Sequence, residues 1–245
     1  MRGRTLLFAL LLATAFDTRL EASCIDPARL AHSAVSITRL FDDAERSTKA
    51  GVIGISATAW FLSSTTIVTV EHVSTAMMLT ARDWKTLDIR DGNDSRSIPA
   101  RVTRVMGLGA ERLAVIELHS ELPGARTAAI HTGPLMPDAE VVTLAYAGDR
   151  PRVVGGRFVK YVDDERFGDA ALLELFDGND RLAVDHGASG APVYDCDGRV
   201  VAVVSTVITQ TLGGFLGGVR VSTAWGTPNV LSVPIKALEH SLQAR

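Results

Sequence analysis

Residues 185–192 read DHGASGAP, and residues 193–205 continue as VYDCDGRVVAVVS. The small residues around Ser189 leave little side chain to shield the main chain, and Gly187 and Gly190 allow a sharp turn. Two amides that converge in such a turn can stabilise the negative oxygen that develops when a serine attacks a carbonyl. We therefore expect Ser189 to be a nucleophile and the N–H groups of Gly187 and Ser189 to form an oxyanion hole.

A β-hairpin is predicted directly after this turn. Pro192–Tyr194 and residues 200–204 are rich in β-branched and aromatic side chains, and the Asp197-Gly198 pair between them suits a tight loop. The hairpin argues against the nucleophile elbow of α/β-hydrolases, in which a helix follows the serine.

The rest of the chain also has the pattern of short strands separated by turns, which predicts an all-β protein. Strands are expected at residues 36–41, 54–62, 67–70, 84–89, 98–105, 113–118, 141–146, 153–162 and 171–175. Short helices are expected at residues 26–30, where Asp26 can cap and Pro27 takes the first position, and at residues 234–242. Residues 121–125, ELPGA, are the best candidate for a crossover between two halves.

The N-terminus has the form of a secretory signal peptide. Two arginines precede the apolar run LLFALLLATAF at residues 6–16, which is shorter than the roughly 20 residues that span a bilayer. We expect cleavage after Ala22, which makes residues 1–22 the signal; cleavage after Ala15 is the alternative. The protein is then periplasmic or secreted, with no stable membrane span.

Cysteine usage agrees with export. The chain has two cysteines, Cys24 and Cys196, and an even count in an exported chain favours a disulfide between them. Lipidation at Cys24 is the less favoured alternative, because Glu21 stands where a bacterial lipoprotein signal has an apolar residue.

Length and charge narrow the class of protein further. About 220 residues remain after signal removal, which suits one all-β domain or two fused barrels. The net charge of −3 and the pI near 6.1 argue against a nucleic-acid partner, which usually shows as a basic excess. The oligomeric state is left open.

A serine nucleophile needs a base that titrates near neutral pH, and histidine is the usual one. Of the six histidines we choose His72, because it ends the strand-rich stretch WFLSSTTIVTVEHV at residues 60–73. His186 lies in the same turn as Ser189, which does not aim its ring at the hydroxyl.

The order of these motifs resembles the chymotrypsin-fold serine proteases. A hairpin that ends in His72 is followed by ERLAVIEL at residues 111–118, GASGAP around Ser189 and NVLSVPI at residues 229–235. Within these proteases the chain most resembles the bacterial trypsin-like peptidases related to the HtrA proteases, without a PDZ-like segment.

The resemblance implies a fold and an activity. The fold is two six-stranded antiparallel β-barrels with a short C-terminal helix: residues 23–120 carry the histidine and residues 121–245 carry the serine. The activity is that of a serine endopeptidase, which cleaves a polypeptide substrate through an acyl-enzyme on Ser189, with His72 as general base and no metal or organic cofactor.

One position departs from the family pattern. Arg112 stands where the family has the aspartate that orients the histidine, and Glu111 is one residue away. Glu111 is a candidate for the orienting acid, and Asp42, Asp43 and Asp185 are alternatives. The same departure supports a second interpretation, a catalytically weak or inactive module that binds peptides or partner proteins in the cleft.

The resemblance also bears on specificity and activation. Val184, Ser205 and Thr206 are expected to line the pocket for the residue before the cleaved bond, and no acidic residue there would attract Lys or Arg. We expect a preference for small apolar residues. Ala188 replaces the aspartate that digestive enzymes use for zymogen activation, so no cut beyond signal removal is expected.

Overall fold

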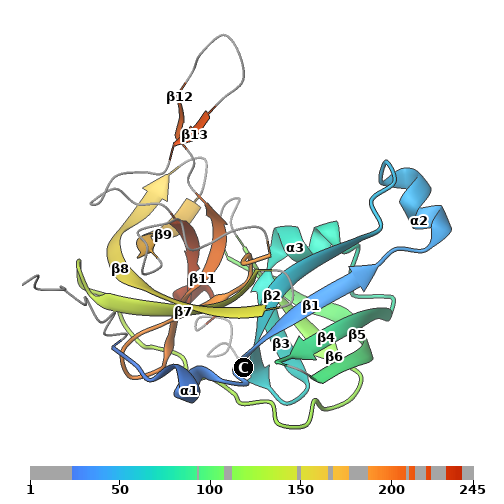
Figure 1. Ribbon diagram of the computed structural model, residues 1–245, viewed down its shortest axis with the longest axis horizontal. Coiled ribbons are helices and arrows are strands. Elements are labelled where there is room, and N and C mark those ends of the chain that lie inside the picture. Colours follow the sequence, from blue (N-terminus) through green and yellow to red (C-terminus); the bar gives the residue numbers. More distant parts are fainter. Residues whose placement is uncertain are drawn as a thin grey trace, which may run out of the picture.

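The computed structural model describes residues 24–92, 94–107, 112–147, 150–164, 168–176, 187–207, 210–212, 219–221 and 230–238. Within these residues the chain forms two closed, antiparallel barrels of six strands each, which lie side by side (Figure 1). The expected chymotrypsin-like, all-β fold is therefore confirmed.

The first barrel closes in the order β1-β2-β3-β6-β5-β4. Its strands are β1 (Ala34–Leu40), β2 (Gly54–Ser63), β3 (Thr66–Val70), β4 (Lys85–Asp91), β5 (Asp94–Met106) and β6 (Leu113–Leu118). Trp60 and Phe61 of β2 are fully buried in its core. Burial of aromatic and β-branched side chains of this kind is the main force that holds a small barrel together.

The second barrel closes in the order β10-β11-β14-β9-β8-β7. Its strands are β7 (Glu140–Ala147), β8 (Arg150–Asp164), β9 (Gly168–Phe176), β10 (Pro192–Tyr194), β11 (Val200–Val207) and β14 (Val230–Pro234). A two-stranded sheet of β12 (Gln210–Leu212) and β13 (Val219–Val221) projects from this barrel (Figure 1). Its core contains the fully buried Phe158 and Leu173.

Three short helices are α1 (Pro27–Leu30), α2 (Asp43–Thr48) and α3 (Glu71–Ala76). The expected helix α1 is present, and the carboxylate of its cap Asp26 accepts from Ala28 N at 2.9 Å. Helices α2 and α3 were not expected from the sequence. In the described part of the chain, no helix has the length and apolar character needed to cross a membrane.

The expected C-terminal helix needs a correction at its start. Pro234 is the last residue of β14 and pairs with Ala202 of β11, so the helix does not begin there. Residues 236–238 are helical, and residues 239–242 lie outside the described part of the chain.

A linking segment between β6 and β7, residues 119–139, ties the two barrels together. It donates from Ala128 N to Phe61 O of the first barrel at 3.3 Å. It also pairs with Val200 of the second barrel, which donates to Ala129 O at 2.8 Å and accepts from His131 N at 2.9 Å. Backbone hydrogen bonds to both barrels fix this segment in place.

Candidate active site

The turn that carries Ser189 is held by one hydrogen bond within it and one to the neighbouring strand β11. Ala191 N donates to Ala188 O at 2.9 Å, and Gly190 N donates to Val204 O of β11 at 2.8 Å. Gly187 and Gly190 have φ values of 101° and 89°, in the region that favours glycine. In a trans peptide the C=O and N–H point in opposite directions, so the Ser189 amide points away from the interior of the turn.

Gly190 brings the turn into direct contact with the first barrel. A Cβ atom at this position would lie 2.0 Å from Thr58 O and 2.0 Å from Thr69 Oγ1. Thr58 lies on β2 and Thr69 on β3, so the turn is packed against two strands of the opposite barrel. The turn therefore sits where the barrels meet, as a site between the two barrels requires.

The hydroxyl of Ser189 is engaged with the main chain. Its Oγ donates to the main-chain oxygen of Ser205 at 2.9 Å, and Ser205 is itself fully buried on β11. A serine hydroxyl has one proton to donate. It must therefore rotate away from Ser205 O before it can give that proton to a histidine.

His72 is the second residue of α3 and is exposed. Helix α3 follows β3 without an intervening loop, and β3 contains Thr69, which lies against Gly190 of the turn. Strand β3 thus runs from its contact with the turn that carries Ser189 directly into the helix that carries His72. The sequence placed His72 at the end of a strand, and the structure places it just beyond that strand.

Arg112, the residue at the expected aspartate position, is paired with the residue before His72. Its guanidinium contacts both carboxylate oxygens of Glu71, with Nη2 2.6 Å from Oε1. The amide of Glu71 also donates to Arg112 O at 2.7 Å. A cation therefore joins the start of β6 to the start of α3 at the place where the family has an anion.

The other sequence candidates are described only in part. Glu111, Val184 and Asp185 lie outside the described residues, and Thr206 is described as part of β11 only in its main chain. Asp42 caps α2 by accepting from Glu45 N at 2.8 Å, and Asp43 pairs with Arg46 in the same helix.

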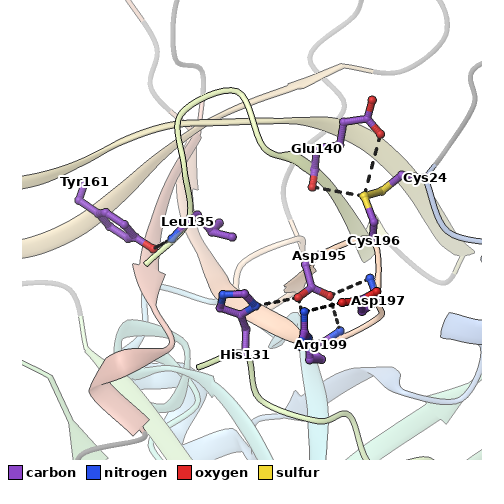
Figure 2. Close-up of polar contacts among 9 residues, drawn as sticks. All are labelled: Cys24, His131, Leu135, Glu140, Tyr161, Asp195, Cys196, Asp197 and Arg199. Atoms are coloured by element: carbon purple, nitrogen blue, oxygen red, sulfur yellow. Dashed lines mark hydrogen bonds and ion pairs between the residues drawn. A yellow bond between two sulfur atoms is a disulfide. The ribbon is translucent and has the colours of Figure 1, made fainter. Parts of the chain in front are cut away.

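The hairpin behind Ser189 is braced by a disulfide and a carboxylate. The expected disulfide between Cys24 and Cys196 is present and joins the segment before α1 to the β10–β11 loop (Figure 2). In the same loop Asp195 accepts from His131 Nδ1 at 2.8 Å and from Arg199 Nε at 2.8 Å (Figure 2). Burial alone would raise the pKa of Asp195, but hydrogen bonds from Arg199 and His131 outweigh it, so the pKa is lowered and the carboxylate stays charged.

In the described part of the chain, side-chain atoms that could bind a metal ion come close together at one place. Cys24, Glu140 and Cys196 offer such atoms within 4.8 Å of one another, but both sulfurs belong to the disulfide. This cluster is therefore a covalent brace for the hairpin.

Thr58 and Thr69 could not be singled out from the sequence, although both contact the turn that carries Ser189. Threonine alternating with apolar residues in β2 and β3 is an ordinary strand pattern. Only their full burial separates them from surface threonines, and burial follows from the closed barrel.

Comparison with known families assigns the chain to a class. Residues 57–203, which include His72 and Ser189, match the model of the trypsin-like peptidase domain. The protein belongs to this family, and the resemblance expected from its motifs is confirmed. No match to the chain is found among curated proteins.

Solved structures agree on the fold. The active form of the Rv3671c protease from M. tuberculosis is similar with a TM-score of 0.60 and 15% identity, over 89% of this chain and 82% of that chain. An inactive form of the Rv3671c protease is similar with a TM-score of 0.56 and 18% identity, over 89% of this chain and 90% of that chain. Deg5 is similar with a TM-score of 0.56 and 14% identity, over 87% of this chain and 88% of that chain.

Proposed function

We propose that the protein is an exported serine endopeptidase that cleaves polypeptides through an acyl-enzyme on Ser189. His72 is the general base, and the amides of Gly187 and Ser189 bind the oxyanion. Residues 1–22 are the signal peptide that directs export.

The conformation of the turn is the observation that carries this proposal. The Ala188 carbonyl is bonded inside the turn to Ala191 N, so the Ser189 amide is directed out of the turn, where in this proposal it donates to the oxygen of a substrate carbonyl. A turn that only connected strands would have no need for an outward amide beside a serine in a trypsin-like peptidase domain.

The proposed reaction proceeds in two halves. Ser189 Oγ gives its proton to His72 and forms a bond to the substrate carbonyl carbon, and the negative oxygen is held by the two amides. His72 then returns the proton to the leaving nitrogen as the C–N bond breaks, which leaves an ester on Ser189. In the second half a water attacks that ester, again with His72 as base, and releases the acid.

Two features modulate this scheme. The Ser189 hydroxyl first has to leave Ser205 O, to which it donates at 2.9 Å. Glu111 is proposed as the acid that orients His72, because it is the nearest carboxylate in sequence to the family's aspartate position. Loss of that acid can lower kcat by about 10⁴ while the serine and histidine still react.

Specificity is proposed to come from Val184, Ser205 and Thr206, which favour a small apolar residue before the cleaved bond. Cleavage of peptide libraries tests this directly. A preference for Arg or Lys at that position would overturn the proposed specificity.

The intact mass of the exported protein tests the signal peptide. We expect Ser23 as the first residue.

The central test is labelling of the mature protein with a fluorophosphonate probe, read by intact mass. We expect one probe on Ser189 in the wild type and none in Ser189→Ala or His72→Ala. The two variants also serve as controls for probe attachment at other hydroxyls. A folded wild type that takes up no probe would overturn the peptidase proposal.

The second candidate is an inactive module that binds peptides in the same cleft. It is favoured by the pairing of Arg112 with Glu71 and by the hydrogen bond from Ser189 Oγ to Ser205 O. A wild type that binds peptides in a pull-down with defined libraries, but takes up no probe, is the result expected of this module.

A further inference from the structure

Thr58 connects the first barrel to both ends of the Ser189 turn. Its amide donates to Ser189 O at 3.0 Å, and its hydroxyl donates to Gly187 O at 2.7 Å. The residue is fully buried on β2. One threonine of the first barrel thus holds two carbonyls that flank the proposed oxyanion amide of the second barrel.

These two contacts set the orientation of successive peptide units. Thr58 holds the carbonyl of the 187–188 peptide and the carbonyl of the 189–190 peptide. Between them, the carbonyl of Ala188 is held by Ala191 N at 2.9 Å. With both neighbours fixed, the 188–189 peptide cannot flip without breaking a hydrogen bond, so the Ser189 amide stays directed outward.

The Thr58 hydroxyl has a second role that only a hydroxyl can fill. While it donates to Gly187 O, it accepts from Tyr146 N of β7 at 3.0 Å. The Thr58 main-chain oxygen accepts from Thr69 Oγ1 of β3 at 2.9 Å. An apolar side chain of the same shape would leave the buried N–H of Tyr146 and the partly buried C=O of Gly187 without this partner, which is costly.

We propose that Thr58 is a positioning residue for the oxyanion site. It acts through the turn, by keeping the Gly187 and Ser189 carbonyls on the side of the first barrel, and it couples this geometry to the docking of the two barrels. The catalytic part of this statement rests on the proposed function. The structural part, that Thr58 sets the conformation of the turn, stands by itself.

The test compares three variants of the mature protein. Thr58→Val removes the hydroxyl and keeps the shape, and Thr58→Ser keeps the hydroxyl. Thr143→Val is the matched control, because Thr143 is also fully buried and its hydroxyl also donates to a carbonyl, Pro192 O, at 2.8 Å. If Thr58→Val does not fold, Thr58→Ala carries the same comparison.

The first measurement is amide hydrogen exchange at Gly190 and Ala191, whose N–H groups donate to Val204 O of β11 and to Ala188 O of the turn. We expect exchange at least about 10-fold faster in Thr58→Val than in the wild type, with no such change in Thr58→Ser or Thr143→Val. Unchanged exchange at both amides in Thr58→Val would overturn the proposal, whether or not the wild type is an enzyme.

The second measurement is catalysis. We expect Thr58→Val to lower kcat by about 10- to 100-fold with little change in KM, and to weaken binding of a peptide boronic acid by a similar factor. Thr58→Ser should restore most of the kcat. An equal loss of kcat in Thr143→Val, or an effect of Thr58→Val on KM alone, would overturn the positioning role.

A wild type without probe labelling would overturn the proposed function. The exchange measurement would still decide the role of Thr58 in the turn.

Discussion

Arg112 and Glu71 form a two-point ion pair directly before His72, with Arg112 Nη2 2.6 Å from Glu71 Oε1. The pair links the residue before β6 to the first residue of α3. Both side chains are partly exposed, at 45% and 23%, so solvent screens their attraction and the pair contributes little to stability. The pair is important because Arg112 places a positive charge where the family has the acid that orients the histidine.

Replacement of Arg112 by aspartate is expected to raise activity. Arg112→Asp and Arg112→Asn both remove the pair with Glu71, and they differ only in the charge of a similar side chain. A carboxylate at this position can hold the imidazole and stabilise its protonated form, so we expect the aspartate variant to label at least about 10-fold faster than the asparagine variant. Fluorophosphonate labelling rates check this. Equal rates would show that position 112 does not reach His72 and would direct attention to Glu111.

The disulfide between Cys24 and Cys196 is expected to be a major stabilising element. It closes a loop of 172 residues, and loss of a native disulfide typically costs about 2–5 kcal/mol through the unfolded chain. The double variant Cys24→Ser/Cys196→Ser should show that loss in urea unfolding.

The control is the wild type with a thiol reductant. We expect the reduced wild type to match the double variant, and the double variant to be insensitive to the reductant. A double variant as stable as the oxidised wild type would contradict this prediction.

The strands could be predicted from sequence because their signal is local. The apolar run at residues 113–118 matches β6 residue for residue, and the turn expected between the strands at residues 54–62 and 67–70 falls between β2 and β3. Helix α2 had a readable signal that was missed: Asp42 and Glu45 form a capping box.

The partners of the Ser189 turn could not be predicted in this way. Thr58 and Gly187 are 129 residues apart and meet only because both barrels close and dock. Residue type and spacing carry no information about such a contact. The same applies to Ser205, where the sequence suggested a pocket residue and the structure adds a hydrogen bond from Ser189 to its main chain.

Glu45 is expected to make stability dependent on acid pH. The hydrogen bond from Arg39, opposed by burial and aided by Lys85, lowers the pKa of Glu45 from 4.5 to about 2. Because the folded-state pKa is depressed, the stabilisation is complete above pH 4.5 and is lost as the pH falls toward 2. Glu45→Gln should be less stable than the wild type by about 2 kcal/mol at pH 7, and the difference should shrink through this window.

Urea unfolding at a series of pH values checks this prediction. The matched control is Glu121→Gln, since Glu121 is exposed and accepts from Ser64 Oγ at 3.1 Å. We expect the free energy of unfolding of this control to stay close to that of the wild type at neutral pH. A difference between wild type and Glu45→Gln that is the same at pH 7 and pH 3 would contradict the role of the lowered pKa.

Gly190 is expected to tolerate no side chain, and Gly51 provides the matched control. Both have positive φ, 89° and 83°, so alanine at either position carries a similar backbone penalty of about 1–2 kcal/mol. A Cβ at Gly51 meets nothing within 4 Å, whereas one at Gly190 lies 2.0 Å from Thr58 O and from Thr69 Oγ1. The backbone of Thr58 and the buried side chain of Thr69 can move only at a high cost in free energy. In urea unfolding, Gly190→Ala should therefore lower the free energy of unfolding by at least about 3 kcal/mol more than Gly51→Ala does.

The catalytic consequence of Gly190→Ala follows from the same contact. If the variant folds, the turn has to move away from β2 and β3, and the hydrogen bond from Thr58 N to Ser189 O has to lengthen. Probe labelling of Ser189 should then fall well below that of Gly51→Ala, measured at a temperature where both variants are folded. Equal stability and equal labelling in the two variants would mean that the turn does not rest on the first barrel in solution, and that Thr58 and Thr69 are not its support.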